Sequence, residues 1–164
     1  MSTLIIDSFE FCRLKESRNG QMPVADLTRL AQEVVGESAG LVWSLQGGAD
    51  QFGHAQLLLE ISGSVQLACQ RCLAPLDVDI SSTSRLIVAK DEVEADRIDE
   101  LLSDDEVDVI VGSKAMLISD LIEDEALLSI PLSVKHDVCP ADSAASYDAG
   151  KKPSAFDVLK ELKR

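Results

Sequence analysis

The clearest pattern in this chain is a long alternation of apolar and polar residues between positions 55 and 88. Apolar side chains occupy odd positions up to Cys69 and even positions after Cys72. A period of two places one side of a strand in a core. The pattern therefore predicts two long strands, over 55–69 and from Cys72 onward, joined by a tight hairpin connection at Gln70-Arg71. Because the first strand is about fifteen residues long, we expect a bulge or bend near Gly63.

Shorter patterns on either side of the hairpin predict the remaining elements. Residues rich in Ile, Leu and Phe predict a first strand, and two further short alternations predict strands of their own, giving strands at 3–12, 41–46 and 107–111. Apolar residues at helical spacing predict two main helices, at 23–35 and 114–130. Ser113 is the expected N-cap of the second helix, and Pro131 ends it.

The C-terminal part differs in composition from the rest of the chain. Residues 140–153 are small and polar and predict a mobile linker. Residues 154–164 then predict a short helix with Phe156, Leu159 and Leu162 on one side. The expected fold is α+β, a mostly antiparallel sheet centred on the long hairpin with two main helices packed on it and a short C-terminal helix. Residues 1–139 would form its single domain.

The net charge of −14 is concentrated in one segment. Between Asp91 and Asp108 lie ten carboxylates and one arginine, and we expect an acidic loop or a ragged helix over 91–106. A protein with this negative charge repels the phosphate backbone of nucleic acids. The charge therefore favours a basic protein as partner, or a nucleic acid that is contacted through a local basic patch. The alternative is a solvated loop that only aids solubility.

The cellular compartment is inferred from features that the sequence lacks. It contains no apolar run of about 18 residues that could span a membrane, and no secretory signal pattern. Four cysteines without such a signal indicate a reducing compartment. We therefore expect a cytoplasmic protein whose cysteines are thiols or metal ligands.

The cysteines give the main candidate site. Cys69 and Cys72 should point to the same side of the hairpin, since each has the parity of its strand's apolar face. With His136 and Cys139 they form Cys-x2-Cys and His-x2-Cys, four ligands suited to tetrahedral zinc. The sequence alone favours partly buried reduced cysteines at a hairpin end over this zinc site. A redox pair is less favoured, because that motif usually opens a helix. Cys12 is expected in the core.

Little in the sequence indicates catalysis. The chain has two histidines and none of the common nucleophile, phosphate-loop or metalloprotease motifs, so we do not expect an enzyme or a small-molecule substrate. The acidic residues of the second main helix, at helical spacing, favour a solvated face over a metal or acid–base cluster; they are Asp120, Glu123, Asp124 and Glu125. Arg71 is a candidate contact for a phosphate or carboxylate.

Two segments together resemble a known family. The first is Cys69-Gln70-Arg71-Cys72-Leu73 after an alternating strand, and the second is the run from Asp120 to His136, with Cys139 following. This combination, with the Phe-x-x-Leu-x-x-Leu-Lys ending, resembles the YceD family, the large ribosomal RNA subunit accumulation proteins of bacteria and plastids.

The resemblance implies a role in synthesis, processing or stability of 23S rRNA, without a defined enzymatic activity. Its implied partners are 23S rRNA, a large-subunit precursor or basic ribosomal proteins. As candidate binding residues we take Arg71, Glu123, Asp124, Glu125 and Lys135. The alternatives are a zinc-binding or thiol-redox protein that uses Cys69 and Cys72, and an acidic adaptor for another protein.

Overall fold

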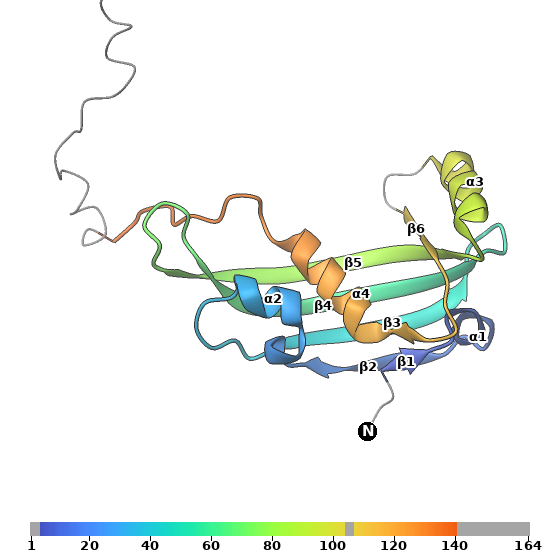
Figure 1. Ribbon diagram of the computed structural model, residues 1–164, viewed down its shortest axis with the longest axis horizontal. Helices are drawn as coiled ribbons and strands as arrows, with labels where there is room; N and C mark the ends of the chain where they lie inside the picture. The colour runs from blue at the N-terminus through green and yellow to red at the C-terminus, as the bar shows by residue number, and fades with distance from the viewer. Residues whose placement is uncertain (1–3, 104–106, 141–164) are drawn as a thin grey trace, which may run out of the picture.

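A five-stranded sheet forms the body of the protein in the computed structural model, which describes residues 4–103 and 107–140 (Figure 1). In spatial order its strands are β2 (Ser17–Met22), β3 (Leu41–Ala49), β4 (Ala55–Ala68), β5 (Pro75–Ala89) and β6 (Val107–Val111). The strands β2 to β5 pair antiparallel, and β6 pairs parallel to β5. The predicted α+β fold, centred on a long hairpin, is confirmed.

The two hairpin strands pair without interruption. Their register runs residue for residue from Ala55 opposite Val88 to Ala68 opposite Pro75, so the bulge expected near Gly63 is wrong. Gly63 instead permits a close approach of the preceding strand. A Cβ atom there would lie 2.7 Å from Leu41 Cδ2 and 2.9 Å from the carbonyl oxygen of Gly40.

The hairpin tip is a loop over residues 69–74 rather than the tight connection predicted at Gln70-Arg71. The backbone N–H of Cys69 donates to the carbonyl of Ala74 at 2.9 Å, and that of Leu73 donates to Cys69 at 2.8 Å. Leu73 has a φ of 62°. The longer loop places the backbone N–H of Arg71 3.4 Å from the Cys69 sulfur.

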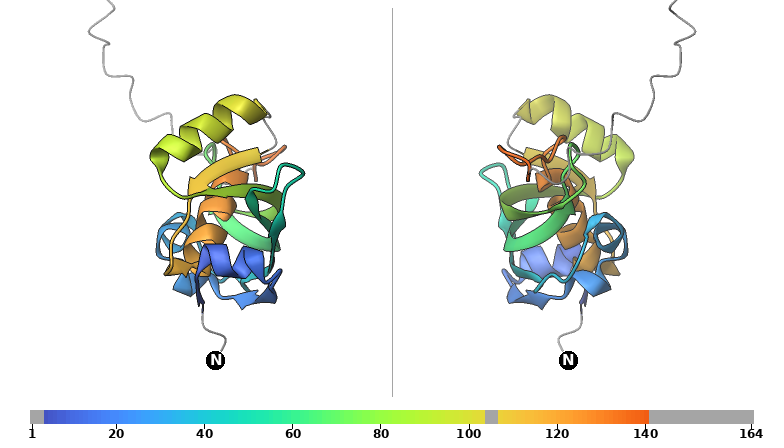
Figure 2. Two further views of the ribbon diagram at one scale, coloured as in Figure 1. Left: turned by 90° about the vertical axis from the view of Figure 1, so that its right-hand side faces the viewer. Right: turned by 90° about the vertical axis from the view of Figure 1, so that its left-hand side faces the viewer.

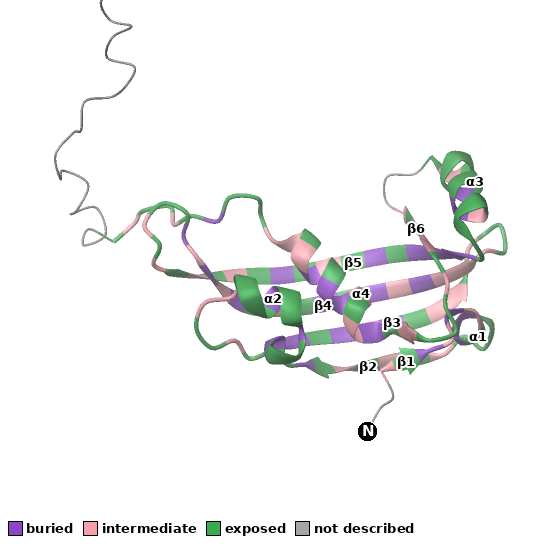
Figure 3. Cartoon of the chain, viewed as in Figure 1, coloured by how far each residue is buried: buried purple, intermediate pink, exposed green. Residues whose placement is uncertain are grey.

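One face of the sheet carries the main core. It is covered by α1 (Ser8–Arg13), α2 (Thr28–Glu33) and α4 (Ile118–Ser129), as Figure 2 shows. The predicted alternation is confirmed, because the apolar side chains of the sheet that point to this face are buried (Figure 3); they include Leu41, Trp43, Leu45, Leu57, Leu59, Ile61, Val65, Leu67, Ile80, Leu86 and Val88.

The first strand predicted at 3–12 is wrong over most of its length. Only β1 (Ile5–Ile6) is extended, and α1 follows at once. The helix forms here because the Asp7 carboxylate accepts hydrogen bonds from the backbone N–H groups of Phe9 and Glu10, both at 3.1 Å. The apolar side chains of this segment then lie on one side of a helix, and Phe11 and Cys12 are buried there.

Both predicted main helices are shorter in the structure. The first is divided into η1 (Val24–Asp26) and α2 by Leu27, whose φ of −102° and ψ of 90° are extended. The second begins at Ile118, because the two residues before it form β7 (Met116–Leu117), which pairs with β1. Ser113 Oγ accepts from the N–H of Ala115 at 3.1 Å, so this residue caps a turn instead of the helix.

Of the loop or ragged helix predicted over the acidic segment 91–106, the structure shows the helix, because α3 (Glu92–Leu102) occupies most of the segment. The Asp91 carboxylate caps this helix by accepting from the N–H of Glu94 at 2.8 Å. Ala95 and Ile98 are buried against Ile87, on the sheet face opposite the main core. The carboxylates of the helix lie mostly on its solvent side.

Residues 1–3, 104–106 and 141–164 lie outside the described part of the chain. The linker predicted over 140–153, apart from Pro140, and the helix predicted over 154–164 therefore stay predictions. Among the described helices, none is both long and apolar enough to cross a membrane.

Candidate metal centre

Two chain segments meet at the tip of the long hairpin. Cys69 and Cys72 belong to the loop that joins β4 to β5, and His136 and Cys139 to the segment that follows α4. The backbone N–H of Gln70 donates to the carbonyl of Val134 at 2.8 Å and holds the two segments together. Figure 1 shows the segment after α4 running back to the tip loop. The sequence predicted this grouping across the 63 residues that separate Cys72 from His136.

The four side chains are arranged as metal ligands would be. Their ligand atoms all lie within 4.8 Å of one another. The Cys69 and Cys139 sulfurs are 3.9 Å apart, and Cys72 Sγ lies 3.4 Å from His136 Nδ1. With Zn–S bonds of about 2.3 Å and Zn–N bonds of about 2.0 Å, a tetrahedron has S–S edges of about 3.8 Å and S–N edges of about 3.5 Å. The residues therefore fit a tetrahedral ion such as zinc.

Backbone groups around Cys69 favour its thiolate. The side chain is fully buried, and the N–H groups of Arg71 and His136 both approach its sulfur to 3.4 Å. Burial raises the pKa of this thiol, but hydrogen bonds from the backbone N–H groups of Cys72, His136 and Arg71 outweigh it and lower the pKa to about 5. Such N–H groups stabilise metal-bound sulfur in the same way.

The pKa values of Cys72, His136 and Cys139 are also shifted by hydrogen bonds, burial and the neighbouring sulfurs. A hydrogen bond from the Ala74 backbone lowers the pKa of Cys72. Burial, and then the sulfurs of Cys72 and Cys69, raise the pKa of Cys139 to about 11. Hydrogen bonds to the Cys69 and Cys72 sulfurs raise the pKa of His136. Three thiolates so close together repel one another, and a bound cation would remove that repulsion.

Cys12 does not contribute to this cluster. It is buried in the main core, as expected, although in α1 and not in a strand. Its thiol donates to the carbonyl of Gln56 at 3.2 Å, and burial raises its pKa. Cys12 is therefore a natural control for experiments on the other three cysteines.

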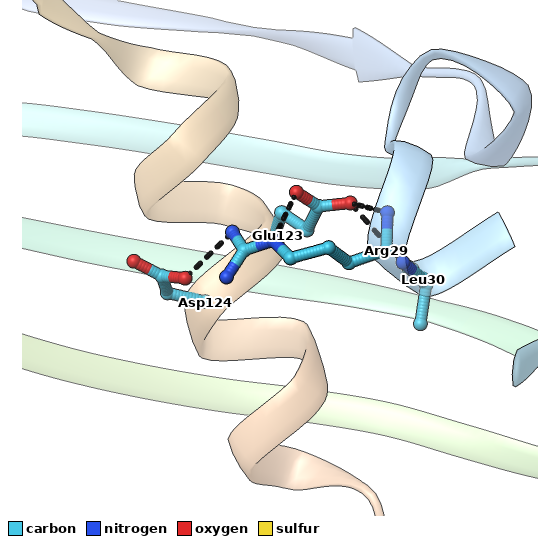
Figure 4. Close-up of polar contacts among 4 residues, drawn as sticks. All are labelled: Arg29, Leu30, Glu123 and Asp124. Carbon is cyan, nitrogen blue, oxygen red and sulfur yellow. Dashed lines mark hydrogen bonds and ion pairs between the residues drawn. The ribbon is translucent and has the colours of Figure 1, made fainter. Parts of the chain in front are cut away.

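The solvated helix face predicted on α4 is wrong for Glu123. Its carboxylate is buried, and it accepts hydrogen bonds from the backbone N–H groups of Arg29 at 2.6 Å and Leu30 at 3.1 Å (Figure 4). Arg29 Nε donates to the same carboxylate at 2.9 Å. Glu123 therefore caps the N-terminus of α2. The signal in the sequence was the absence of a capping side chain at Leu27.

The neighbouring acidic residues also have partners within the protein. Asp124 pairs with Arg29 at 2.7 Å, and Glu125 accepts a hydrogen bond from the hydroxyl of Ser82. These contacts connect α4 to α2 and to β5, which gives both residues a structural role. Arg71 and Lys135 differ from them, because both are exposed and each lies next to a ligand of the cluster.

The comparison with solved structures gives no match for this chain. A family model described as large ribosomal RNA subunit accumulation protein YceD matches residues 57–163. The matched range covers more than half of the chain and contains most of the long hairpin, α4 and all four residues of the cluster. The chain belongs to the YceD family, whose description implies a role in the accumulation of the large ribosomal subunit.

Proposed function

We propose that this protein is a ribosome-assembly accessory factor that acts by binding, and that supports the synthesis, processing or stability of 23S rRNA. A structural zinc ion held by Cys69, Cys72, His136 and Cys139 shapes its binding end. The observation that carries the proposal is the position of this four-ligand cluster inside the part of the chain that matches the family.

The ligand set supports zinc in a structural role. Three sulfurs and one imidazole nitrogen are a common donor set for structural zinc and a poor one for magnesium or calcium. All four positions of a tetrahedron are supplied by the protein, so no position is open for water or substrate. A thiol-redox function has less support, because Cys69 and Cys72 lie in a loop between strands and not at the start of a helix.

The ion would join two segments that few other contacts hold. In the described chain, the loop over 69–74 and the segment after α4 meet through the cluster, the backbone bond from Gln70 to Val134, and a bond of 3.5 Å from Gln70 Nε2 to the carbonyl of Leu132. The binding energy of a metal ion would add to the contact that the buried Val134 makes with the main core. The ion would also hold together the tip loop, which carries the exposed Arg71, and the segment after α4, which carries the exposed Lys135. Both cations can then contact a partner.

The charge distribution supports a partner within an assembling large subunit. The solvent side of α3 is acidic and suits a basic ribosomal protein. Arg71 and Lys135 provide a local positive site for rRNA phosphate in an otherwise acidic chain. Both contacts are available on a precursor particle, which contains basic proteins and RNA together.

The proposal is tested by sedimenting a bacterial lysate through a sucrose gradient. We expect the protein in fractions that hold large-subunit precursors, with less of it there after the double change Arg71→Ala and Lys135→Ala. Lys114→Ala is the matched control, because this exposed lysine follows β6 at the opposite end of β5 from the tip. A protein that stays at the top of the gradient in every condition contradicts the proposal and favours an adaptor for an unrelated partner.

The gradient is followed by binding to 23S rRNA fragments at several salt concentrations. Affinity that falls steeply with salt indicates direct phosphate contacts by the tip. Binding to isolated basic ribosomal proteins without binding to RNA indicates the acidic surface instead.

A further inference from the structure

A groove of mixed polarity lies next to the metal cluster and has no partner among the described residues. It has a volume of about 360 Å³ and is bounded by the end of β4, the end of α4 and the segment after it. About half of its exposed lining surface is polar, but most of its lining side chains are aliphatic; they include Leu67, Leu127, Ile130, Pro131, Leu132 and Val134. Leu132 is fully exposed at its edge, and among the described residues the only charged side chain of the lining is the carboxylate of Glu33. The groove therefore suits an amphipathic segment with basic residues.

The C-terminal residues of this chain have that character. Phe156, Leu159 and Leu162 recur every three residues, the spacing of one side of a helix. From position 151 onward the chain carries five basic and two acidic residues, whereas the chain as a whole has a net charge of −14. The segment is thus complementary in charge to the body and in polarity to the groove.

The path of the chain makes this contact easy to reach. The described part ends at Pro140, directly after the ligand Cys139, and the groove residue Gln70 directly follows the ligand Cys69. The sulfurs of these two ligands are 3.9 Å apart. Residues 141–153 can span up to about 45 Å when extended. A tether of this length gives the segment an effective concentration of about 1 mM at the groove.

We propose that residues 154–164 bind in the groove formed by β4, α4 and the segment after α4 of the same chain. Phe156, Leu159 and Leu162 supply the buried side, and the basic residues around them face Glu33 and the acidic surface of the body. The inference goes beyond the proposed function, and its test uses the isolated protein without any ribosomal component, so either can fail without the other.

Hydrogen exchange of the full-length protein, read by mass spectrometry, tests this contact. If the groove binds the segment with an affinity of about 0.1 mM, the amides of residues 154–164 exchange about tenfold more slowly than in an unstructured chain. Leu132→Asp abolishes this slowing, because it places a charge at the groove edge. Leu128→Asp is the matched control, since this residue of α4 is 79% exposed and does not line the groove. Unchanged exchange in β4 shows that both variants are folded.

Three results would overturn the proposal. Exchange of residues 154–164 at the unstructured rate in the wild type means that the segment does not bind. Slowing that survives Leu132→Asp means that it binds elsewhere. Slowing that increases with protein concentration means that the groove is filled by a second copy of the chain.

Discussion

The carboxylate of Glu123 holds Arg29 through two hydrogen bonds, one from the backbone nitrogen at 2.6 Å and one from Nε at 2.9 Å. A third bond, from the N–H of Leu30 at 3.1 Å, completes the cap of α2. The N–H groups in the first turn of a helix have no acceptor within the helix, and Leu27 at the N-cap of α2 supplies no side-chain cap. A buried acidic residue of α4, distant in sequence, therefore decides where α2 begins.

The variant Glu123→Gln should lower the free energy of unfolding by about 2 kcal/mol. Glutamine keeps the shape but replaces bonds to a charged acceptor with weaker ones, and it removes one of the two carboxylates that pair with Arg29. Urea denaturation followed by circular dichroism measures the change. Asp124→Asn is the control, because this half-exposed pair with Arg29 should contribute less than about 1 kcal/mol. Equal losses in both variants would contradict the capping role.

Acid should destabilise the protein partly through the same carboxyl group. Burial raises the pKa of Glu123, but the bonds from Leu30 and Arg29 outweigh it and hold the pKa below the usual value of 4.5. The stabilisation is therefore complete above pH 4.5 and is lost as the pH falls through the lower pKa of the folded state. Unfolding free energies measured between neutral pH and pH 3 should fall less steeply in Glu123→Gln than in the wild type. Parallel curves would show that Glu123 does not contribute.

The neighbouring glycines of β3 should tolerate alanine very differently. A Cβ atom at Gly47 would lie 2.5 Å from the carbonyl oxygen of Phe11, whereas one at Gly48 meets nothing within 4 Å. We expect Gly47→Ala to cost about 1–3 kcal/mol, since α1 must move. Gly48→Ala should change stability by less than about 0.5 kcal/mol. Thermal melting of the two variants checks the packing of α1 on β3, and similar melting temperatures would argue against it.

The tip loop makes a separate prediction at Leu73. Its φ of 62° lies in the left-handed region, and its side chain is 77% exposed. Leu73→Gly should therefore leave the melting temperature unchanged or raised, because glycine adopts this conformation freely. Leu73→Val should lose about 1 kcal/mol or more, since a β-branched residue is strained there. If valine is tolerated as well as glycine, the loop has a different backbone path.

The sequence predicted those parts of the fold that depend on local periodicity. Alternation placed Leu57, Leu59 and Ile80 in the core, and the parity of Cys69 and Cys72 placed both thiols on one side. The errors arose where a capping contact or a distant partner decided the outcome. The Asp7 cap stabilises a helix in an apolar run that was predicted to be a strand. Ala95 and Ile98 pack on a second apolar surface of the sheet, which the sequence did not predict.

The candidate site was predicted to a similar extent. His136 and Cys139 could be grouped with the hairpin cysteines from their residue types alone. The role of Glu123 could not, because its partners are backbone N–H groups of a helix 93 and 94 residues away. Local sequence carries no signal for such a contact beyond the missing cap at Leu27.

The metal content of the protein, purified without chelator, tests the central claim most directly. Elemental analysis should find about one zinc ion per chain in the wild type and in Cys12→Ala, and none in Cys69→Ser or Cys139→Ser. A chelator should lower the melting temperature of the first two proteins only, because binding energy at such a site contributes to folding. A wild-type protein that contains no zinc, takes up none when it is added, and melts at the same temperature with chelator would contradict the account.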